Sequence, residues 1–363
     1  MNDAVFLRLG LTVILCLSGL VFQRTKIISI LQMGWIMIIT CFNTMSVDWL
    51  SNFEIYQNSS LYHGFFGWLM NFFKNQFHVD FSIFNGVLAA ISLILIFYVI
   101  VKETQRPNIV LSFWMIFPMI DNIVQKRYFW GFGLVVVAVY LLIKVTNKWL
   151  AIVAFELLIL LAYSIHNAYI FFLFLPFFLL LSRKKQIIIV FIGVILGLIF
   201  SGSLLSISQE LFPDLSSKVN LYFGALSNIP IASLLLWGAW QFVQLYIVYE
   251  LYRNDKNVFG NLIIGSNIFF VILIPLYIFD PVFIRCFRPI LLFNYIGMAN
   301  KITVYAGTGN QILMNRRVFC ILIVDFIITL VTFYLFDVSS ITSVGFDSMV
   351  KMIYSNNSFL NLK

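Results

Sequence analysis

The feature that most constrains this chain is its shortage of charged side chains between long apolar stretches. Only 10% of the 363 residues are charged and 61% are hydrophobic, whereas a typical soluble domain carries about 25% charged residues. So few charges cannot cover the surface of a soluble protein of this size, which excludes a cytosolic enzyme, a secreted disulfide scaffold and a disordered chain. We therefore predict an all-α, polytopic membrane protein that forms a single integral membrane domain over residues 1–363.

Apolar runs between polar breaks predict about twelve transmembrane helices, because each helix needs about 20 apolar residues to cross a bilayer. The expected ranges are 4–22, 27–42, 82–101, 108–123, 128–144, 149–165, 168–182, 186–204, 229–250, 258–279, 288–305 and 318–336. Some are short, so tilt or partial burial is expected there. No small-residue cleavage site follows the first range, which indicates a retained helix and not a removed signal.

The distribution of Lys and Arg over the breaks predicts the orientation of the chain. Alternate breaks carry 14 of the 23 basic residues, at Gln23–Lys26, Lys102–Arg106, Lys144–Lys148, Arg183–Lys185, Arg253–Asn257 and Lys301–Arg317. Ten of the 15 acidic residues fall on the opposite side. The basic breaks are therefore expected to face the cytoplasm, and both termini are expected to lie outside a bacterial cytoplasmic (inner) membrane.

Two expected external loops are long, at 43–81 and 205–228. Long loops on one face indicate that the working surface is external. Residues 61–73 of the first loop are amphipathic if helical and rich in aromatic residues, among them Tyr62 and Trp68. This segment is either an interfacial helix anchored by its aromatic side chains or a lid that faces a carbohydrate.

Four external cations depart from the positive-inside trend and occupy two short turns, Lys126 with Arg127 and Arg285 with Arg288. Arg285 and Arg288 are three residues apart, so a helical turn places both on one face. Guanidinium groups at the membrane surface suit phosphate or pyrophosphate oxygens. The alternatives are contact with lipid headgroups and pairing with Asp121 and Asp280.

The remaining candidates are His166, at the outward end of the sixth expected helix, and two carboxylates, Glu156 and Asp325, within apolar ranges. The imidazole could act as a base or as a phosphate donor, or could simply bond between helices. Intramembrane carboxylates are candidate functional groups by default. The four cysteines are scattered, and no metal-ligand cluster or cofactor motif is present. Despite an isoelectric point of 9.3, no nucleic-acid ligand is expected.

In layout the chain resembles the EpsG-like branch of the Wzy-type polysaccharide polymerases. Four features carry the resemblance, and they occur in the order in which that branch shows them. The first two are Asp48 to Tyr56 in the external loop and Gln125-Lys126-Arg127 at the start of a later helix. The other two are Ile165-His166-Asn167-Ala168 and an outward arginine at Arg285 or Arg288. The Arg-x-x-x-Gly-Thr stretch that usually precedes the loop aspartate is replaced by residues 43–47.

The resemblance implies an enzyme that polymerises capsular, O-antigen or exopolysaccharide repeat units, a glycosyltransferase-type reaction. The growing glycan would move from undecaprenyl pyrophosphate to a hydroxyl of the next lipid-linked unit at the outer membrane face, without a cofactor or metal. The resemblance implies that Arg127, Arg285 and Arg288 bind the pyrophosphate, with Lys126 in support. It implies a catalytic base among His166, Asp48 and Glu54. It also implies sugar contacts by Tyr56, Tyr62 and Trp68. Membrane lipids, a chain-length regulator and a flippase are the partners it implies.

Other classes stay open at this point. A lipid-linked oligosaccharide flippase also suits twelve helices, although flippases usually have short loops on both faces. The second alternative is another outward-facing transferase on polyprenyl phosphate sugars, or an enzyme that resembles the O-antigen ligases. The third is a secondary transporter that uses Glu156 and Asp325.

Overall fold

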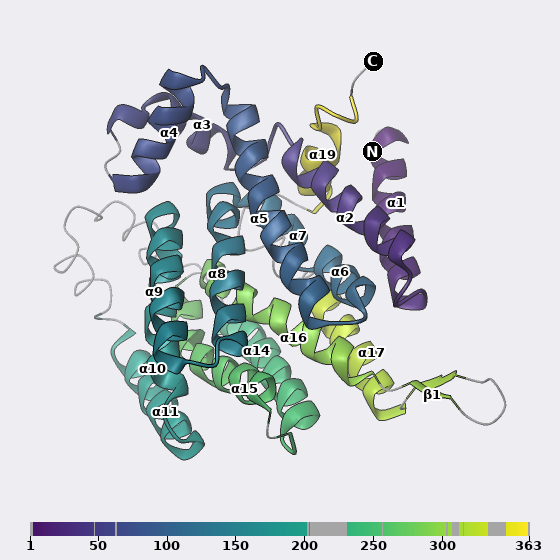
Figure 1. The fold of residues 1–363 in the computed structure, drawn as a ribbon, viewed down its shortest axis with the longest axis vertical. Helices are drawn as coiled ribbons and strands as arrows, with labels where there is room; N and C mark the ends of the chain where they lie inside the picture. Colours follow the sequence, from purple (N-terminus) through teal and green to yellow (C-terminus); the bar gives the residue numbers. More distant parts are fainter. Residues whose placement is uncertain are drawn as a thin grey trace. The chain divides into compact units, whose positions relative to one another are not determined.

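The computed structural model describes residues 3–46, 48–61, 64–201, 203, 231–255, 257–279, 281–302, 304–306, 312–314, 316–332 and 346–361. The expected loop 205–228 lies outside these residues, as do Tyr62 and Asp280. The chain forms two compact units (Figure 1). Unit 1 comprises Met1–Leu173 with Gly345–Lys363, and unit 2 comprises Phe174–Val344.

Unit 1 is built from helices that follow the apolar ranges of the sequence. Its elements are α1 (Asp3–Val21), α2 (Lys26–Cys41), α3 (Trp49–Gln57), η1 (Ser59–Leu61), α4 (Gly64–Gln76), α5 (Phe81–Glu103), α6 (Pro107–Ile116), α7 (Met119–Val124), α8 (Lys126–Lys144), α9 (Lys148–Ile165), η2 (Asn167–Phe174) and α19 (Phe346–Ser355). Helix α5 packs along α8, where the Ser92 hydroxyl donates to the Phe129 carbonyl at 2.8 Å. Gly133 permits this close approach, because an added Cβ would lie 2.7 Å from the Ser92 carbonyl oxygen.

Unit 2 consists of α10 (Leu175–Leu179), α11 (Arg183–Ile199), α14 (Ile231–Tyr252), α15 (Val258–Phe270), η5 (Val271–Ile278), η6 (Pro281–Phe287), α16 (Arg288–Lys301), β1 (Val304–Ala306), β2 (Ile312–Met314) and α17 (Arg316–Thr332). The two strands form an antiparallel pair in which Tyr305 lies opposite Leu313. Reciprocal amide bonds of 2.7 and 2.9 Å between Asn267 and Asn294 join α15 to α16. Such buried polar pairs hold helices together where lipid offers no hydrophobic driving force.

Six helical segments of the described residues are long and apolar enough to cross a membrane: Asp3–Val21, Phe81–Glu103, Lys126–Lys144, Lys148–Ile165, Val258–Ile278 and Val282–Lys301. Shorter apolar helices occur at Lys26–Cys41, Pro107–Ile116 and Asn167–Leu179. The chain is therefore an all-α polytopic protein, as its composition predicted.

Two of the expected helices are irregular in a way that the apolar runs did not reveal. The range 108–123 is divided at Phe117 and Pro118 into α6 and α7, because proline has no N–H to donate and its ring obstructs the preceding turn. The range 168–182 begins as the eight-residue 3-10 helix η2 before α10. A hydrophobic run predicts burial in the membrane, but it does not distinguish these helical forms.

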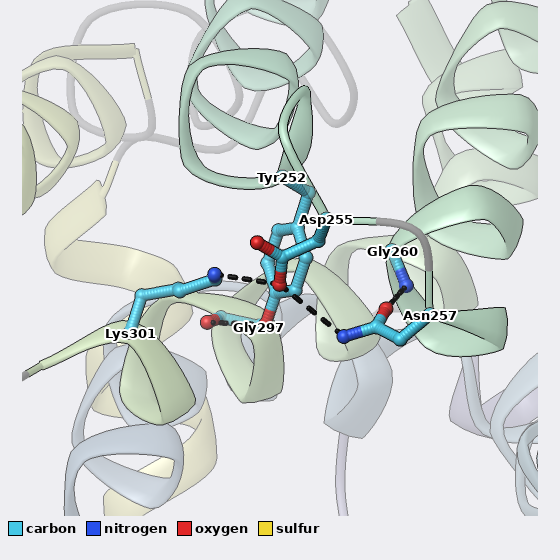
Figure 2. A network of polar contacts seen from close by, with 6 residues as sticks. All are labelled: Tyr252, Asp255, Asn257, Gly260, Gly297 and Lys301. Atoms are coloured by element: carbon cyan, nitrogen blue, oxygen red, sulfur yellow. Dashed lines mark hydrogen bonds and ion pairs between the residues drawn. The ribbon is translucent and has the colours of Figure 1, made fainter.

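Ion pairs join polar breaks within each unit taken by itself. In unit 1, the Lys144 ammonium lies 2.8 Å from the Glu103 carboxylate, so two of the basic breaks share one end. In unit 2, the Lys301 ammonium lies 2.7 Å from the Asp255 carboxylate, which joins the end of α16 to the α14–α15 turn. Figure 2 shows this network, in which the Asn257 amide also donates to Asp255.

The C-terminal segment packs against the start of the chain. Helix α19 lies beside α1 and α2 (Figure 1), and the Tyr354 hydroxyl is 2.9 Å from the Thr12 hydroxyl. The Arg8 guanidinium donates to the carbonyl of Leu360 and the side chain of Asn361, both at 2.9 Å. Burial raises the pKa of Tyr354 to about 12, so the phenol stays protonated and able to donate.

Candidate functional site

The first cation of the Lys126–Arg127 turn is enclosed by the outer loop of unit 1. Lys126 begins α8 and is only 3% exposed. Its ammonium donates to the Asn43 carbonyl at 3.4 Å and lies 5.0 Å from the centre of the Trp49 ring, which begins α3. The Asp48 carboxylate is close enough to act electrostatically on the same ammonium. A carbonyl, an aromatic face and a carboxylate therefore offset part of the cost of burying this charge.

Arg127 follows on the same turn and is half-buried. The preceding residues Asp121, Asn122 and Gln125 are all buried polar residues. Both side-chain polar atoms of Asn122 lack a hydrogen-bond partner among the described residues. A buried polar group without a partner is costly, so such a group at a cationic turn favours contact with a polar ligand.

His166 lies one residue after α9 and packs against the same helix start. Its ring centre is 5.6 Å from that of Tyr128, the residue after Arg127, and 6.2 Å from that of Tyr169. The Tyr169 hydroxyl donates to the Tyr128 carbonyl, which ties η2 to α8. His166 is thus brought next to the cationic turn, although about 40 residues of sequence separate them.

The hydrogen bonding of the imidazole favours one of its two expected roles. Its Nδ1 accepts the backbone N–H of Ala168 at 3.1 Å. A neutral imidazole whose Nδ1 is an acceptor carries its proton on Nε2. The Nε2 atom is then a donor, which suits a phosphate oxygen better than it suits the removal of a proton from a hydroxyl.

The two loop carboxylates lie on one short element in different settings. Asp48 immediately precedes α3 and lies near Lys126, whereas Glu54 is exposed on α3 itself. The structure therefore places Asp48 with the cationic turn, and Glu54 one to two turns further along the helix. Both remain candidate bases.

The aromatic residues of the outer loop divide into a buried and an exposed set. Tyr56 is 1% exposed, and its hydroxyl donates to the Val79 carbonyl at 2.6 Å. Burial and the nearby Asp80 raise the pKa of its phenol. Trp68 is 56% exposed on α4, and its ring stacks on Phe72 with centres 5.3 Å apart. Tyr56 thus supports the loop, and Trp68 presents an aromatic face.

The second cationic turn belongs to unit 2. Arg285 lies in the 3-10 helix η6 and is half-buried, and Arg288 begins α16 and is fully buried. The two residues are three positions apart across the junction of η6 and α16, so they lie about one helical turn apart. Both guanidinium groups act electrostatically on the thiol of Cys286 between them.

In unit 1 the structure places Asp48 and the Trp49 ring near Lys126, and it packs His166 against Tyr128, the residue after Arg127. Glu54 is exposed further along α3. Arg285 and Arg288 form a separate pair in unit 2. Sequence reasoning missed Asn43, whose carbonyl accepts from Lys126. Its position directly after an apolar range was the available signal, but asparagine at a helix end is common.

The two carboxylates of the apolar ranges lie in separate units, with Asp325 buried and Glu156 half-buried. Asp325 in α17 accepts a hydrogen bond from the Gln244 side chain of α14. One carboxylate oxygen of Glu156 in α9 is buried without a hydrogen-bond partner among the described residues. The described residues contain no group of three or more His, Cys, Asp or Glu side chains that could hold a metal ion.

The apolar helices and the polar breaks between them define the class: a multi-pass membrane protein. The chain belongs to the EpsG family, whose family model matches residues 26–343. This membership suggests a role in exopolysaccharide biosynthesis. No curated protein and no solved structure matches the chain.

Proposed function

We propose that this protein polymerises polysaccharide repeat units at the outer face of the bacterial cytoplasmic membrane. The acceptor hydroxyl oxygen attacks the anomeric carbon of the growing glycan and forms the new glycosidic bond. The bond from that carbon to undecaprenyl pyrophosphate breaks, and the hydroxyl proton passes to a carboxylate. Membership of the EpsG family supports the pathway. The observation that carries the reaction is the grouping of a cationic turn, an imidazole and a carboxylate in unit 1.

Each group has a role that follows from its chemistry. Arg127, Arg285 and Arg288 donate to pyrophosphate oxygens, where preorganised cations stabilise the charge that develops on the leaving group. Lys126 supports the first turn. His166 donates through Nε2 to a phosphate oxygen, and Asp48 or Glu54 takes the proton. Trp68 stacks on a sugar ring, and Tyr56 holds the loop behind it.

The proposal includes the full topology expected from the sequence. Twelve transmembrane helices form one integral membrane domain with both termini outside, and the loops 43–81 and 205–228 face the substrate. The wider partners are lipid-linked oligosaccharides, membrane lipids, a chain-length regulator and a flippase. The polymers in question are capsular, O-antigen or exopolysaccharide chains.

Reconstitution tests the reaction. Purified protein in liposomes receives lipid-linked repeat units, and the products are separated on a gel. A ladder of longer glycans in the wild type, lost in Arg127→Ala, supports a polymerase. Movement of the lipid across the bilayer without a longer product would show a flippase instead.

A further inference from the structure

A half-open groove of about 400 Å³ lies between α2 and α5 in unit 1. Its sides are mostly apolar, with Met37 from α2 and Ile83, Val87 and Ala90 from α5. The volume falls within the range of about 300–1,000 Å³ that is usual for ligand sites. Gly86 forms part of the wall, and an added Cβ there would lie 3.0 Å from the Cys41 carbonyl oxygen.

The position of the groove determines what can fill its apolar part. Helix α5 is long and apolar enough to cross the membrane, and α2 is a shorter apolar helix. Ile83 and Val87 remain exposed on the groove side of α5. At a membrane-spanning surface such side chains face hydrocarbon, and an unfilled apolar groove there would lose dispersion contacts. An apolar chain is therefore the kind of ligand that suits this part of the groove.

The other end of the groove is polar. Asn43, Thr44, Ser82 and Ser358 line it. Asn43 is 1% exposed, and its Oδ1 is buried without a hydrogen-bond partner among the described residues. An acceptor of this kind suits a hydroxyl donor, which a sugar or a hydrated headgroup supplies but a hydrocarbon chain does not.

The polar end is also joined to the candidate site. The Asn43 carbonyl accepts from the Lys126 ammonium, and Lys126 acts electrostatically on Cys41, another residue that lines the groove. The C-terminal segment closes one side, where Ser358 N–H donates to the Phe42 carbonyl at 2.9 Å. A lipid whose chain occupies the groove would thus place its headgroup beside the Lys126–Arg127 turn.

We infer that the α2–α5 groove binds the isoprenoid chain of a lipid-linked glycan, with its polar headgroup at Asn43. The identity of the lipid rests on the proposed function. Ala90 lines the groove with a single methyl group, which leaves width for the methyl branches of an isoprenoid. A diacyl phospholipid has no such branches.

Photo-crosslinking in nanodiscs tests this inference without requiring catalysis. One probe is a polyprenyl pyrophosphate with a photoreactive group in its chain, and the other is a diacyl phospholipid that carries the same group. We expect the polyprenyl probe to label residues 82–90 and the Ala90→Phe variant to lower this labelling about tenfold. The matched control, Ile91→Phe, alters a neighbouring residue that does not line the groove and should label like the wild type.

Two results would overturn the inference. One is unchanged polyprenyl labelling in a folded Ala90→Phe variant, and the other is equal labelling of the groove by the phospholipid probe. Folding is checked by size-exclusion profile, and Ala90→Leu provides a smaller obstruction if Ala90→Phe fails to fold. If the wild-type protein shows the expected labelling but does not extend glycans, the proposed function is rejected and the lipid-binding groove is not. The two outcomes can be told apart because labelling and extension are measured in separate assays.

Discussion

The two cationic turns look alike in the sequence but differ in their surroundings. In unit 1, Lys126 is held by one backbone carbonyl at 3.4 Å and an aromatic face at 5.0 Å. In unit 2, Arg288 starts α16, is fully buried, and follows Arg285 of η6 by three residues. The first turn is covered by a loop, whereas the second is part of the helical core.

This difference has a physical consequence for each turn. A lysine ammonium is a compact charge that can change partners, while a guanidinium fixes several donors in one plane. The turn in unit 2 is preorganised, and substitutions there should have larger effects on both folding and chemistry.

The largest effect is expected for Arg288→Ala. Glycan extension should fall about 1,000-fold, the upper part of the range for loss of one preorganised donor. Removal of a fully buried cation also leaves its partners unpaired, so the melting temperature should fall as well. Extension is measured in liposomes with equal amounts of monodisperse protein, and Arg288→Lys serves as the charge-conserving variant. If folded Arg288→Ala extends glycans at the wild-type rate, Arg288 does not contribute to the reaction.

A smaller loss is expected for Arg127→Ala, which alters a half-buried side chain. Extension should fall about 100-fold, with a melting temperature close to that of the wild type. Lys351→Ala removes an exposed cation of α19 and is the matched control. If Arg127→Ala and Lys351→Ala lose activity equally, a general effect of surface charge explains the result better than a pyrophosphate contact at Arg127.

The expected effect of His166→Gln is about tenfold, because one hydrogen bond to a charged group is lost. Since we assign His166 as a donor, the variant should retain the shape of the wild-type pH–rate profile. The profile of extension rate against pH is the readout. Loss of one limb of that profile together with a drop of 100-fold or more would identify His166 as the base instead.

The smallest effect is expected for Trp68→Ala on α4. Loss of one aromatic stacking contact should raise the KM for the acceptor about threefold and leave kcat nearly unchanged. The control is Trp149→Ala, which removes an exposed tryptophan at the start of α9. An unchanged KM would favour the alternative that α4 anchors the loop at the membrane surface.

The sequence predicted the helices better than their internal form. Ranges such as 82–101 and 149–165 correspond to α5 and α9, because burial in lipid requires long apolar runs. It did not predict the break at Pro118 or the 3-10 helix η2. Both irregularities leave backbone N–H and C=O groups that neighbouring helices must satisfy. The composition of an apolar run does not indicate such hydrogen bonds.

The candidate site was predicted in part for a similar reason. Residue type and position made Lys126, Arg127 and His166 candidates, and the structure packs the His166 ring against Tyr128, the residue after Arg127. The role of Asn43 and the packing of Arg8 against the C-terminal segment were not foreseen. Arg8 and Leu360 are 352 residues apart, and nothing local in either segment indicates the contact.

Binding of undecaprenyl pyrophosphate tests the central claim most directly, since each turn is assigned to pyrophosphate. Affinity would be measured in nanodiscs for the wild type, Arg127→Ala, Arg285→Ala and the Lys351→Ala control. The account predicts affinity at least about tenfold weaker in both arginine variants, because each loses a charge-assisted hydrogen bond, and no change in the control. Wild-type affinity in both arginine variants would contradict it.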